Sequence, residues 1–427
     1  MGVKRWFGLI LLGTFCLAVG FAMLALDVYR TAPDTWWLPV LSAISLRFLD
    51  RTVRAVIFGG IGLGLVFWGS WGLNRSILRP YMRPGEPVVE TVSAYRRRDR
   101  GPNIVAIGGG TGLSTLLRGL KQQTTHLTAV VTVADDGGSS GELRQSLGIL
   151  PPGDIRNCLV ALSDDEETLS KLFQYRFGNL SGLNGHSLGN LLISALTDIS
   201  GSFEQAVAET GKVLAVRGKV LPSTLNDVNL VADVWSPKLG KEVRVCGESH
   251  IAEVGGKVKR VWLEPSSPYA FPPAIQAILS ADLIVIGPGS LYTSILPNLL
   301  VSDLAAALQA SKALKFFVCN VATEKGETDG YSSLDHLRAI EQQLGGRPFD
   351  VVICNNRFPG EPPAGTQWVR PDEVLEAQYP TYYADLIDEQ QSWRHDSHKL
   401  AQAIMDLYYE KTMPQPEWVQ GEAAVKV

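Results

Sequence analysis

The chain has 427 residues, 45% of them hydrophobic and 19% charged, which is the composition of a folded protein and excludes a disordered one. A net charge of −4 gives no overall bias toward nucleic acid, so no nucleic-acid partner is expected. The five cysteines are scattered, odd in number and without a C-x-x-C spacing. This excludes a disulfide framework and a zinc site, and it favours a reducing compartment.

Two apolar runs, residues 6–26 and 55–73, contain no charged residue. Each is about as long as the ~20 residues that cross a bilayer, so the sequence predicts two transmembrane helices. A cleaved signal peptide is the alternative for the first run, and a buried core helix is the alternative for the second. Residues 1–100 are therefore interpreted as a membrane anchor with a basic linker.

Basic residues set the predicted orientation of this anchor. Lys4 and Arg5 precede the first run, and arginines are dense between the second run and residue 100. The positive-inside rule then places the main part of the chain in the cytoplasm, in a multi-pass protein of the inner (plasma) membrane. The stretch YRRRDRGP, 95–102, could also attract anionic lipid head groups or be a solvated linker.

From residue 103 on, short β-branched runs alternate with amphipathic stretches. NIVAIGGG, LSTLLRGLK and HLTAVVTVADD form a strand, helix and strand, and a similar rhythm returns between 281 and 356. The fold class predicted is α/β, a Rossmann-like, doubly wound, mainly parallel sheet. A mostly helical section, 157–214, and a small β-rich insertion within 225–265 lie between the halves, and residues 414–427 form a polar tail.

The first candidate site is the glycine turn in IGGGTGLSTLLRGL, 107–120. A glycine turn between a strand and a helix can point backbone N–H groups at an anion. No Gly-Lys-Ser/Thr ends the turn and no regular G-x-G-x-x-G is present, so neither a Walker A loop nor a dinucleotide fingerprint is matched. We expect phosphate to bind at Gly109, Gly110, Thr111 and Gly112; the alternative is a turn needed only for close packing.

The second candidate follows the second predicted strand. Asp135 and Asp136 run into Gly137, Gly138, Ser139 and Ser140. Acids at this place contact a ribose hydroxyl in dinucleotide folds, and two neighbouring carboxylates can also hold a hard cation such as Mg²⁺. Spacing alone leaves both open, as it does a solvent-exposed acidic turn.

The third candidate is PPGDIRN, 151–157. Arg156 suits bidentate recognition of a phosphate, and Asn157 adds an amide. Asp154 could ligate a cation or accept a proton, or it could be a helix N-cap. Asp136 and Asp154 are thus the candidates for metal binding and for catalysis.

Three further polar segments follow. The candidate residues in them are His186 and Asn190, then Ser290 and Tyr292, then Asn320 with Thr323 and Glu324. Each could be an ordinary polar loop. Because strand ends repeatedly turn polar and glycine-rich, we expect one shared cleft at the carboxyl edge of the sheet.

Seven segments, in order, closely resemble the gluconeogenesis factor (YvcK-like) family of the CofD-like superfamily. They are IGGGTGLSTLLRGLK, VTVADDGGSSGELR, LPPGDIRNCLVALSD, GHSLGNLLISALTDI, VRGKVLPST, GPGSLYTSILPNLLV and CNVATEKGETDGYSSLDHL. The resemblance covers about 103–413. It implies a Rossmann-like nucleotide-binding domain over 101–413 that binds UDP-N-acetylglucosamine, and a role linking central carbon metabolism to cell-wall synthesis and cell shape.

The resemblance also implies that Arg394, in SWRHDSHKLAQAI, contacts the ligand. Residues 355–372 depart from the family's pattern, because they are shortened and proline-rich where relatives carry a ligand-contacting tyrosine.

Three functions follow as hypotheses. The first is a membrane-tethered, homo-oligomeric regulator without settled enzymatic activity, whose partners are cell-wall or central-carbon enzymes. The second is a CofD-like transferase that acts on a nucleotide-activated donor with Mg²⁺ on Asp136 and Asp154. The third is an NAD-binding oxidoreductase with Asp135 on the ribose.

Overall fold

The computed structural model describes residues 98–164, 168–178 and 182–413, with scattered positions between 11 and 71. The chain divides into two compact units, Met1–Thr91 and Val92–Val427. Most of the two predicted spans, 6–26 and 55–73, and the tail 414–427 lie outside the described residues, so these remain predictions.

Among the described residues, no single helix has both the length and the apolar character to cross a membrane. By those two criteria, one bent pair of helices, Leu291–Leu299 with Ser302–Ala310, passes.

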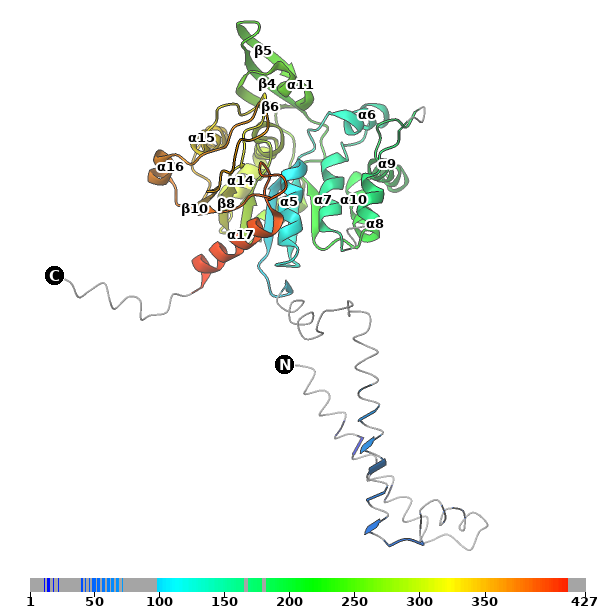
Figure 1. Ribbon diagram of the computed structural model, residues 1–427. Helices are drawn as coiled ribbons and strands as arrows, with labels where there is room; N and C mark the ends of the chain where they lie inside the picture. The colour runs from blue at the N-terminus through cyan, green and yellow to red at the C-terminus, as the bar shows by residue number, and fades with distance from the viewer. Residues whose placement is uncertain are drawn as a thin grey trace, which may run out of the picture. The chain divides into compact units, whose positions relative to one another are not determined.

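A seven-stranded sheet forms the centre of the second unit (Figure 1). Every neighbouring pair is parallel, and the order is β10-β9-β8-β7-β1-β2-β3. The strands are β1 Ile104–Gly108, β2 Leu127–Val131, β3 Lys219–Pro222, β7 Leu283–Ile286, β8 Leu314–Val318, β9 Val351–Asn355 and β10 Thr381–Ala384. This is the doubly wound arrangement predicted from the alternating pattern, with the strand order reversing between β1 and β7.

The central strands are buried because helices cover both faces of the sheet. All residues of β1, β7 and β9 are buried, and Phe316 and Phe317 of β8 are the bulkiest fully buried side chains. Fully buried parallel strands read as continuous apolar runs, which explains why the pattern predicted β1, β2, β7, β8 and β9. The sequence did not predict β3 and β10, which are short edge strands.

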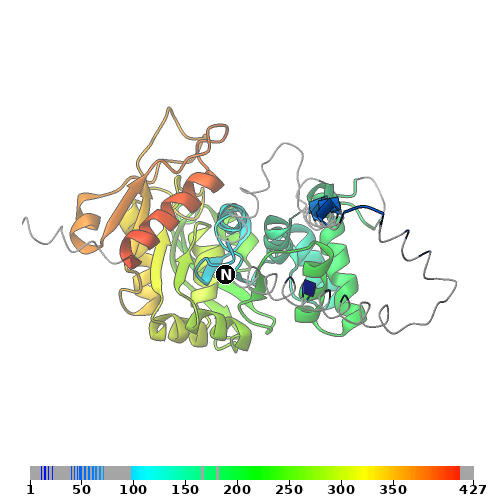
Figure 2. The ribbon, with the colours of Figure 1, turned by 90° about the horizontal axis from the view of Figure 1, so that it is seen from below.

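The helices of this unit follow the predicted rhythm. They are α5 Gly110–Leu120, α6 Gly138–Leu147, α7 Gly153–Leu162, α8 Thr168–Gln174, α9 Leu188–Ser200, α10 Phe203–Val213, α11 Glu248–Val254, α12 Pro272–Leu279, α13 Leu296–Leu299, α14 Ser302–Ala310, α15 Ser333–Leu344, α16 Glu373–Gln378 and α17 Ser397–Thr412, with a π-helical turn, η2, at Leu291–Ile295. Figure 2 shows α8, α9 and α10 gathered on the other side of α5 from α16 and β10.

The predicted β-rich insertion is a separate antiparallel sheet in the order β5-β4-β6, with α11 beside it (Figure 1). Its strands are β4 Asn229–Ser236, β5 Lys241–Cys246 and β6 Lys257–Glu264. The first residues of α11 reach back to the loop after β2, so the insertion contributes to the surroundings of the candidate site.

The last helix, α17, lies along α5 (Figures 1 and 2). The two can approach because Gly119 carries no side chain: a Cβ there would lie 1.9 Å from the Ser397 carbonyl oxygen. Asp396 is the N-cap of α17 and accepts from the N–H groups of His398 and Lys399. This docking fixes the segment that precedes α17, which includes Arg394.

Candidate functional site

A cavity of about 340 Å³ opens at the point where the strand order reverses. Open α/β sheets bind ligands in the crevice at this switch point. The walls come from the N-terminus of α5, the loop between β7 and η2, the loop after β8 and the segment before α17. The lining residues are Gly109, Gly110, Thr111, Gly112, Thr115, Pro288, Gly289, Ser290, Ser294, Asn320, Val321, Ala322, Thr323, Glu324, Lys325, Thr366, Trp393, Arg394 and His395.

The glycine turn at the start of α5 forms one wall. Gly110 has φ +61°, which favours glycine, and a Cβ on Gly112 would lie 2.5 Å from the Pro288 carbonyl oxygen. Gly110 is therefore required by its backbone conformation and Gly112 by close packing, as the tight-turn alternative supposed. The same turn also places the N-terminus of α5 at the cavity, where a helix N-terminus favours negative charge.

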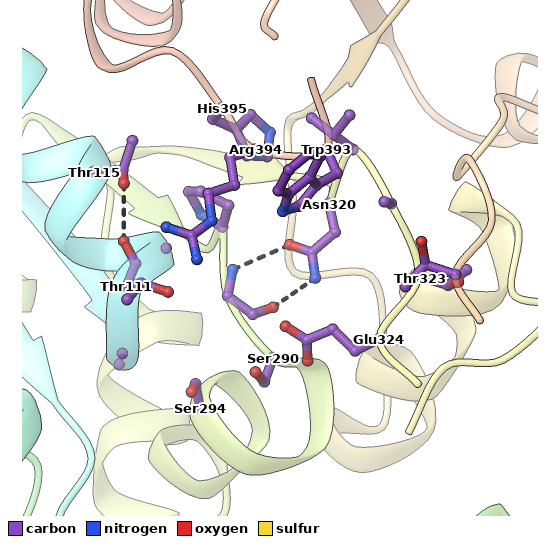
Figure 3. A pocket seen from close by; sticks show the side chains of 18 of the residues that line it. Thr111, Thr115, Ser290, Ser294, Asn320, Thr323, Glu324, Trp393, Arg394 and His395 are labelled. Atoms are coloured by element: carbon purple, nitrogen blue, oxygen red, sulfur yellow. Dashed lines mark hydrogen bonds between the residues drawn. The ribbon is translucent and has the colours of Figure 1, made fainter. Parts of the chain in front are cut away.

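The opposite wall is held by a reciprocal pair of hydrogen bonds. The Gly289 N–H donates to Asn320 Oδ1 at 3.1 Å, and Asn320 Nδ2 donates to the Gly289 carbonyl oxygen at 2.9 Å. Figure 3 shows the Glu324 carboxyl group beside Ser290 on this side of the cavity. The amide of Asn320 is thus used to fix the wall.

The segment Trp393–His395 closes the cavity from the C-terminal side. In Figure 3 the Arg394 guanidinium extends between Thr111 and Asn320. The Arg394 backbone is fixed, since its N–H donates to the Gln391 carbonyl and its carbonyl accepts from Asp388. Its guanidinium has no hydrogen-bond or ion-pair partner among the described residues, which leaves it able to pair with an anionic ligand.

His395 lies behind Arg394 and is buried, with 9% of its surface exposed. Burial lowers the pKa of its imidazole to about 4, against the opposing effect of a hydrogen bond to the backbone of Cys319. The ring is therefore neutral near pH 7, and its Nε2 has no partner among the described residues.

Asp154 lies next to the cavity, beneath the glycine turn. Its Oδ2 accepts from the Gly110 N–H at 2.7 Å, and a Cβ on Gly109 would lie 2.6 Å from the same oxygen. Burial and the neighbouring Asp135 raise the pKa of Asp154 to about 6. The N-cap of α7 in the structure is Pro152, and Asp154 lies in the first turn, so the prediction of Asp154 as a helix N-cap is wrong.

The N-terminus of α6 is joined to α7 and α9 by a buried hydrogen-bond network, which we call the Arg156 network. Arg156 Nη1 donates to Asn190 Oδ1 at 2.8 Å and to Ser187 Oγ, and its Nη2 donates to Asn157 Oδ1 at 2.8 Å. Asn190 Nδ2 in turn donates to Ser139 Oγ at 3.0 Å. Burial lowers the pKa of Arg156 to about 10, which leaves it charged at neutral pH.

Ser139 also contacts His186. The Ser139 Oγ and His186 Nδ1 are 3.0 Å apart, and His186 Nε2 is 3.2 Å from Glu142 Oε2. This serine, histidine and glutamate chain does not line the cavity.

Acidic side chains from the insertion and from the loop after β2 also approach each other. Asp136 Oδ1 accepts from the Ser249 N–H at 2.9 Å, and Asp135 Oδ1 accepts from the Gly137 N–H at 2.9 Å. Burial, together with Asp135 and Asp154, raises the pKa of Glu248 well above its ordinary value. Among the described residues, no three or more His, Cys, Asp or Glu side chains are arranged to hold a metal ion. The magnesium site considered for Asp136 and Asp154, which has two protein carboxylates, stays a prediction.

The structure sorts the predicted site residues into two adjacent groups. Nine line the cavity: Gly109, Gly110, Thr111, Gly112, Ser290, Asn320, Thr323, Glu324 and Arg394. A second group lies beside the cavity without lining it: Asp135, Asp136, Gly137, Gly138, Ser139, Ser140, Asp154, Arg156, Asn157, His186 and Asn190. Tyr292 belongs to neither, since its buried hydroxyl hydrogen-bonds that of Tyr331 at 2.8 Å.

Several lining residues were not singled out from the sequence. Trp393 and His395 flank the predicted Arg394, so their place in that segment was the available signal. Thr366 comes from the shortened proline-rich stretch and carried no recognisable pattern. Glu248, which was not singled out either, does not line the cavity; it begins α11 in the insertion, far in sequence from the acids that raise its pKa.

These features define a class: a doubly wound α/β protein with a polar, anion-compatible cavity at the switch point of its sheet. Residues 104–413 match the family described as 2-phospho-L-lactate transferase CofD. The chain belongs to this CofD-like family, in its gluconeogenesis factor branch.

Three relatives illustrate the match. A protein from Nostoc sp. is 49% identical over 366 residues, which are 84% of this chain and 78% of the relative. The gluconeogenesis factor of Bacillus subtilis is 47% identical over 324 residues, 72% of this chain and 99% of the relative. A crystal structure of a Bacillus halodurans protein is 46% identical, with a TM-score of 0.68, and covers 72% of this chain and 100% of its own.

Proposed function

We propose that the cavity binds a nucleoside diphosphate sugar, UDP-N-acetylglucosamine, and that the protein is a regulator that responds to this ligand. The resemblance of the seven sequence segments supports this ligand, and the name of the Bacillus subtilis relative supports a role in carbon metabolism. In this proposal the protein connects central carbon metabolism with cell-wall synthesis and cell shape.

One observation carries the ligand class. The unpaired Arg394 guanidinium extends toward the N-terminal turn of α5 across the switch-point cavity (Figure 3). A guanidinium fork on one side and helix N–H groups on the other are suited to phosphate oxygens. Polar side chains such as Ser290, Thr323 and Glu324 are then available to the rest of the ligand.

The lining also supports binding rather than turnover. The titratable side chains in the cavity are those of Glu324, Lys325, Arg394 and His395. The neutral His395 has no hydrogen-bonded serine or cysteine side chain among the described residues, so no activated nucleophile faces the ligand.

A regulator responds to its ligand only through a difference in affinity between two states. The segment Trp393–His395 lines the cavity and leads directly into α17, which packs on α5. A ligand held by Arg394 would favour the docked arrangement of α17. We propose that cell-wall or central-carbon enzymes, or a second copy of the chain, respond to this arrangement.

Calorimetric titration of the full-length chain with UDP-N-acetylglucosamine, GDP and NAD, each with and without Mg²⁺, tests the proposal. We expect saturable binding of the uridine nucleotide sugar, and its recovery unchanged after long incubation. Absence of that binding, together with saturable GDP binding that requires Mg²⁺, would refute the proposal that the protein is a regulator that responds to this nucleotide sugar.

That second outcome would favour the transferase alternative, which the description of the matched family supports. Asp154 would then be the acid nearest the phosphates, since it lies directly beneath the glycine turn. The NAD arm of the same titration tests the oxidoreductase alternative.

We further propose that residues 1–100 attach the protein to the plasma membrane, on the basis of the two uncharged apolar runs. Fractionation of lysed cells tests this directly. We expect the full-length chain in the membrane fraction, extracted by detergent and not by high salt; recovery in the supernatant without detergent would refute the attachment.

A further inference from the structure

The cavity is lined by groups of both charges: the cationic side chains of Lys325 and Arg394 and the carboxyl group of Glu324. Arg394 and the N-terminus of α5 favour an anion, whereas Glu324 contributes a carboxyl group on the other side (Figure 3). A carboxylate repels phosphate oxygens, so it does not help to hold the diphosphate. The position of Glu324 therefore requires a different explanation.

The backbone of Glu324 is held in place. Its N–H donates to Thr328 Oγ1 at 2.8 Å, and its carboxyl group lies beside Ser290 (Figure 3). The preceding residue, Thr323, is tied to Gln367 by two hydrogen bonds, of 2.8 and 2.9 Å. The segment that carries the carboxyl group is thus positioned before any ligand arrives, which lowers the entropic cost of using it in binding.

A second carboxyl group lies behind the first. Glu327 is only 7% exposed, and its Oε1 accepts from Thr293 Oγ1 at 2.9 Å. Its Oε2 has no partner among the described residues. Burial and the nearby Glu324 raise the pKa of Glu327 to about 8, and burial also raises the pKa of Glu324. Glu324 lines the cavity and Glu327 does not. Glu324 is therefore the carboxyl group of this pair that can contact a ligand.

We propose that Glu324 selects ligands that carry a hydroxyl-bearing sugar beyond the phosphates, by accepting hydrogen bonds from the sugar hydroxyl groups. This inference rests on the proposed function and assigns the sugar end of the same cavity. A carboxylate accepts hydrogen bonds and donates none when ionised, so hydroxyl groups satisfy it. A phosphate would be repelled, and an apolar group would leave the carboxylate desolvated and unpaired.

The test compares two ligands that differ in the sugar and in the additional ionisable oxygen that its absence leaves on the terminal phosphate. UDP and UDP-N-acetylglucosamine are titrated into the full-length wild-type chain, E324Q and E253Q. The E324Q change keeps the size of the side chain and its ability to accept from Ser290. E253Q removes one carboxylate from an exposed position of α11 that does not line the cavity, so it controls for the change in net charge.

The E324Q substitution should change the affinities for the two ligands differently. UDP-N-acetylglucosamine should bind about 10- to 100-fold more weakly, the range spanned by hydrogen bonds to charged groups. UDP should bind equally or more tightly, because a negative charge near its phosphates has been removed. E253Q should leave both affinities within about twofold, as expected for exposed charges.

The outcomes of these titrations distinguish failure of the proposed function from failure of the inference about Glu324. A wild-type chain that binds neither ligand, or binds only UDP, contradicts the proposed function and the inference with it. A wild-type chain that binds UDP-N-acetylglucosamine, with E324Q weakening UDP and the sugar nucleotide equally, overturns the inference alone and assigns Glu324 to the nucleotide. Equal affinities of wild type and E324Q for both ligands overturn the inference about Glu324 as well. Retained UDP binding in E324Q shows that the cavity is still folded.

Discussion

The carboxylate of Asp154 accepts a hydrogen bond of 2.7 Å from the backbone N–H of Gly110, the first residue of α5. The chain's own acid therefore occupies one of the N–H groups that the glycine turn was predicted to offer a phosphate. The remaining first-turn N–H groups and Arg394 are left for an anionic ligand. Asp154 also supports the turn from beneath, since it contacts both Gly109 and Gly110.

The raised pKa of Asp154 predicts a pH-dependent stability. Its ordinary pKa is 3.8 and its folded pKa is about 6, so the folded state holds the proton more tightly than the unfolded state. The contribution of protonated Asp154 to the free energy of unfolding is fully present below about pH 4 and is lost as the pH rises through about 6. A shift of this size corresponds to about 3 kcal/mol.

D154N isolates this effect, because asparagine does not titrate and can still accept from Gly110. The difference in unfolding free energy between D154N and wild type should shift in favour of D154N between pH 4 and pH 6, and stay constant above pH 7. Denaturant unfolding at several pH values measures it. A difference that does not change with pH would show that Asp154 has an ordinary pKa in the folded state.

G119A should separate α17 from α5. A Cβ at Gly119 would lie 1.9 Å from the Ser397 carbonyl oxygen and 2.7 Å from Ala401 Cβ, so the helices must move apart. Overpacking of this kind costs about 1–3 kcal/mol. Because Ser397 follows the segment that carries Arg394, the affinity for the nucleotide sugar should fall as well.

G211A is the matched control for G119A, since it also changes a helical glycine to alanine. Its Cβ would meet Leu159 Cδ2 at 3.7 Å, an ordinary contact, and the helix gains up to about 1 kcal/mol in propensity. Thermal unfolding should therefore show a loss for G119A and none for G211A. Equal melting temperatures would mean that α5 and α17 are not packed as closely as described.

N190A should destabilise the protein through the Arg156 network. Asn190 is 1% exposed, accepts from Arg156 and donates to Ser139, so its removal leaves a buried guanidinium with one partner fewer. We expect a loss of about 2–3 kcal/mol of unfolding free energy.

T197A on the same helix provides the comparison. The Thr197 hydroxyl donates only to the Ile193 carbonyl at 2.8 Å, within α9, and its loss should cost less than about 1 kcal/mol. The two variants are compared by urea unfolding. If both lose the same stability, the network contributes no more than a local helix contact.

The sequence predicted the buried strands and the switch-point cleft because both have local signals. β1 and β7 are continuous apolar runs that end in glycine turns, and parallel strands place those turns at one edge. β3 and β10 were missed because four-residue edge strands lack such a run. The prediction of one shared cleft was only partly right, since Asp154 turns under Gly110 and Arg156 turns inward to Asn190. Which way a polar side chain turns depends on partners distant in sequence.

Calorimetric titration of UDP-N-acetylglucosamine into the full-length chain, with wild type and R394A compared, tests the central claim most directly. The guanidinium of Arg394 extends into the cavity without a protein partner among the described residues, so its loss should leave the fold intact. We expect saturable binding to wild type and about 10- to 100-fold weaker binding to R394A, as for loss of a charge-assisted hydrogen bond. No saturable binding to wild type, or the same affinity for R394A, would contradict a nucleotide-sugar site in this cavity.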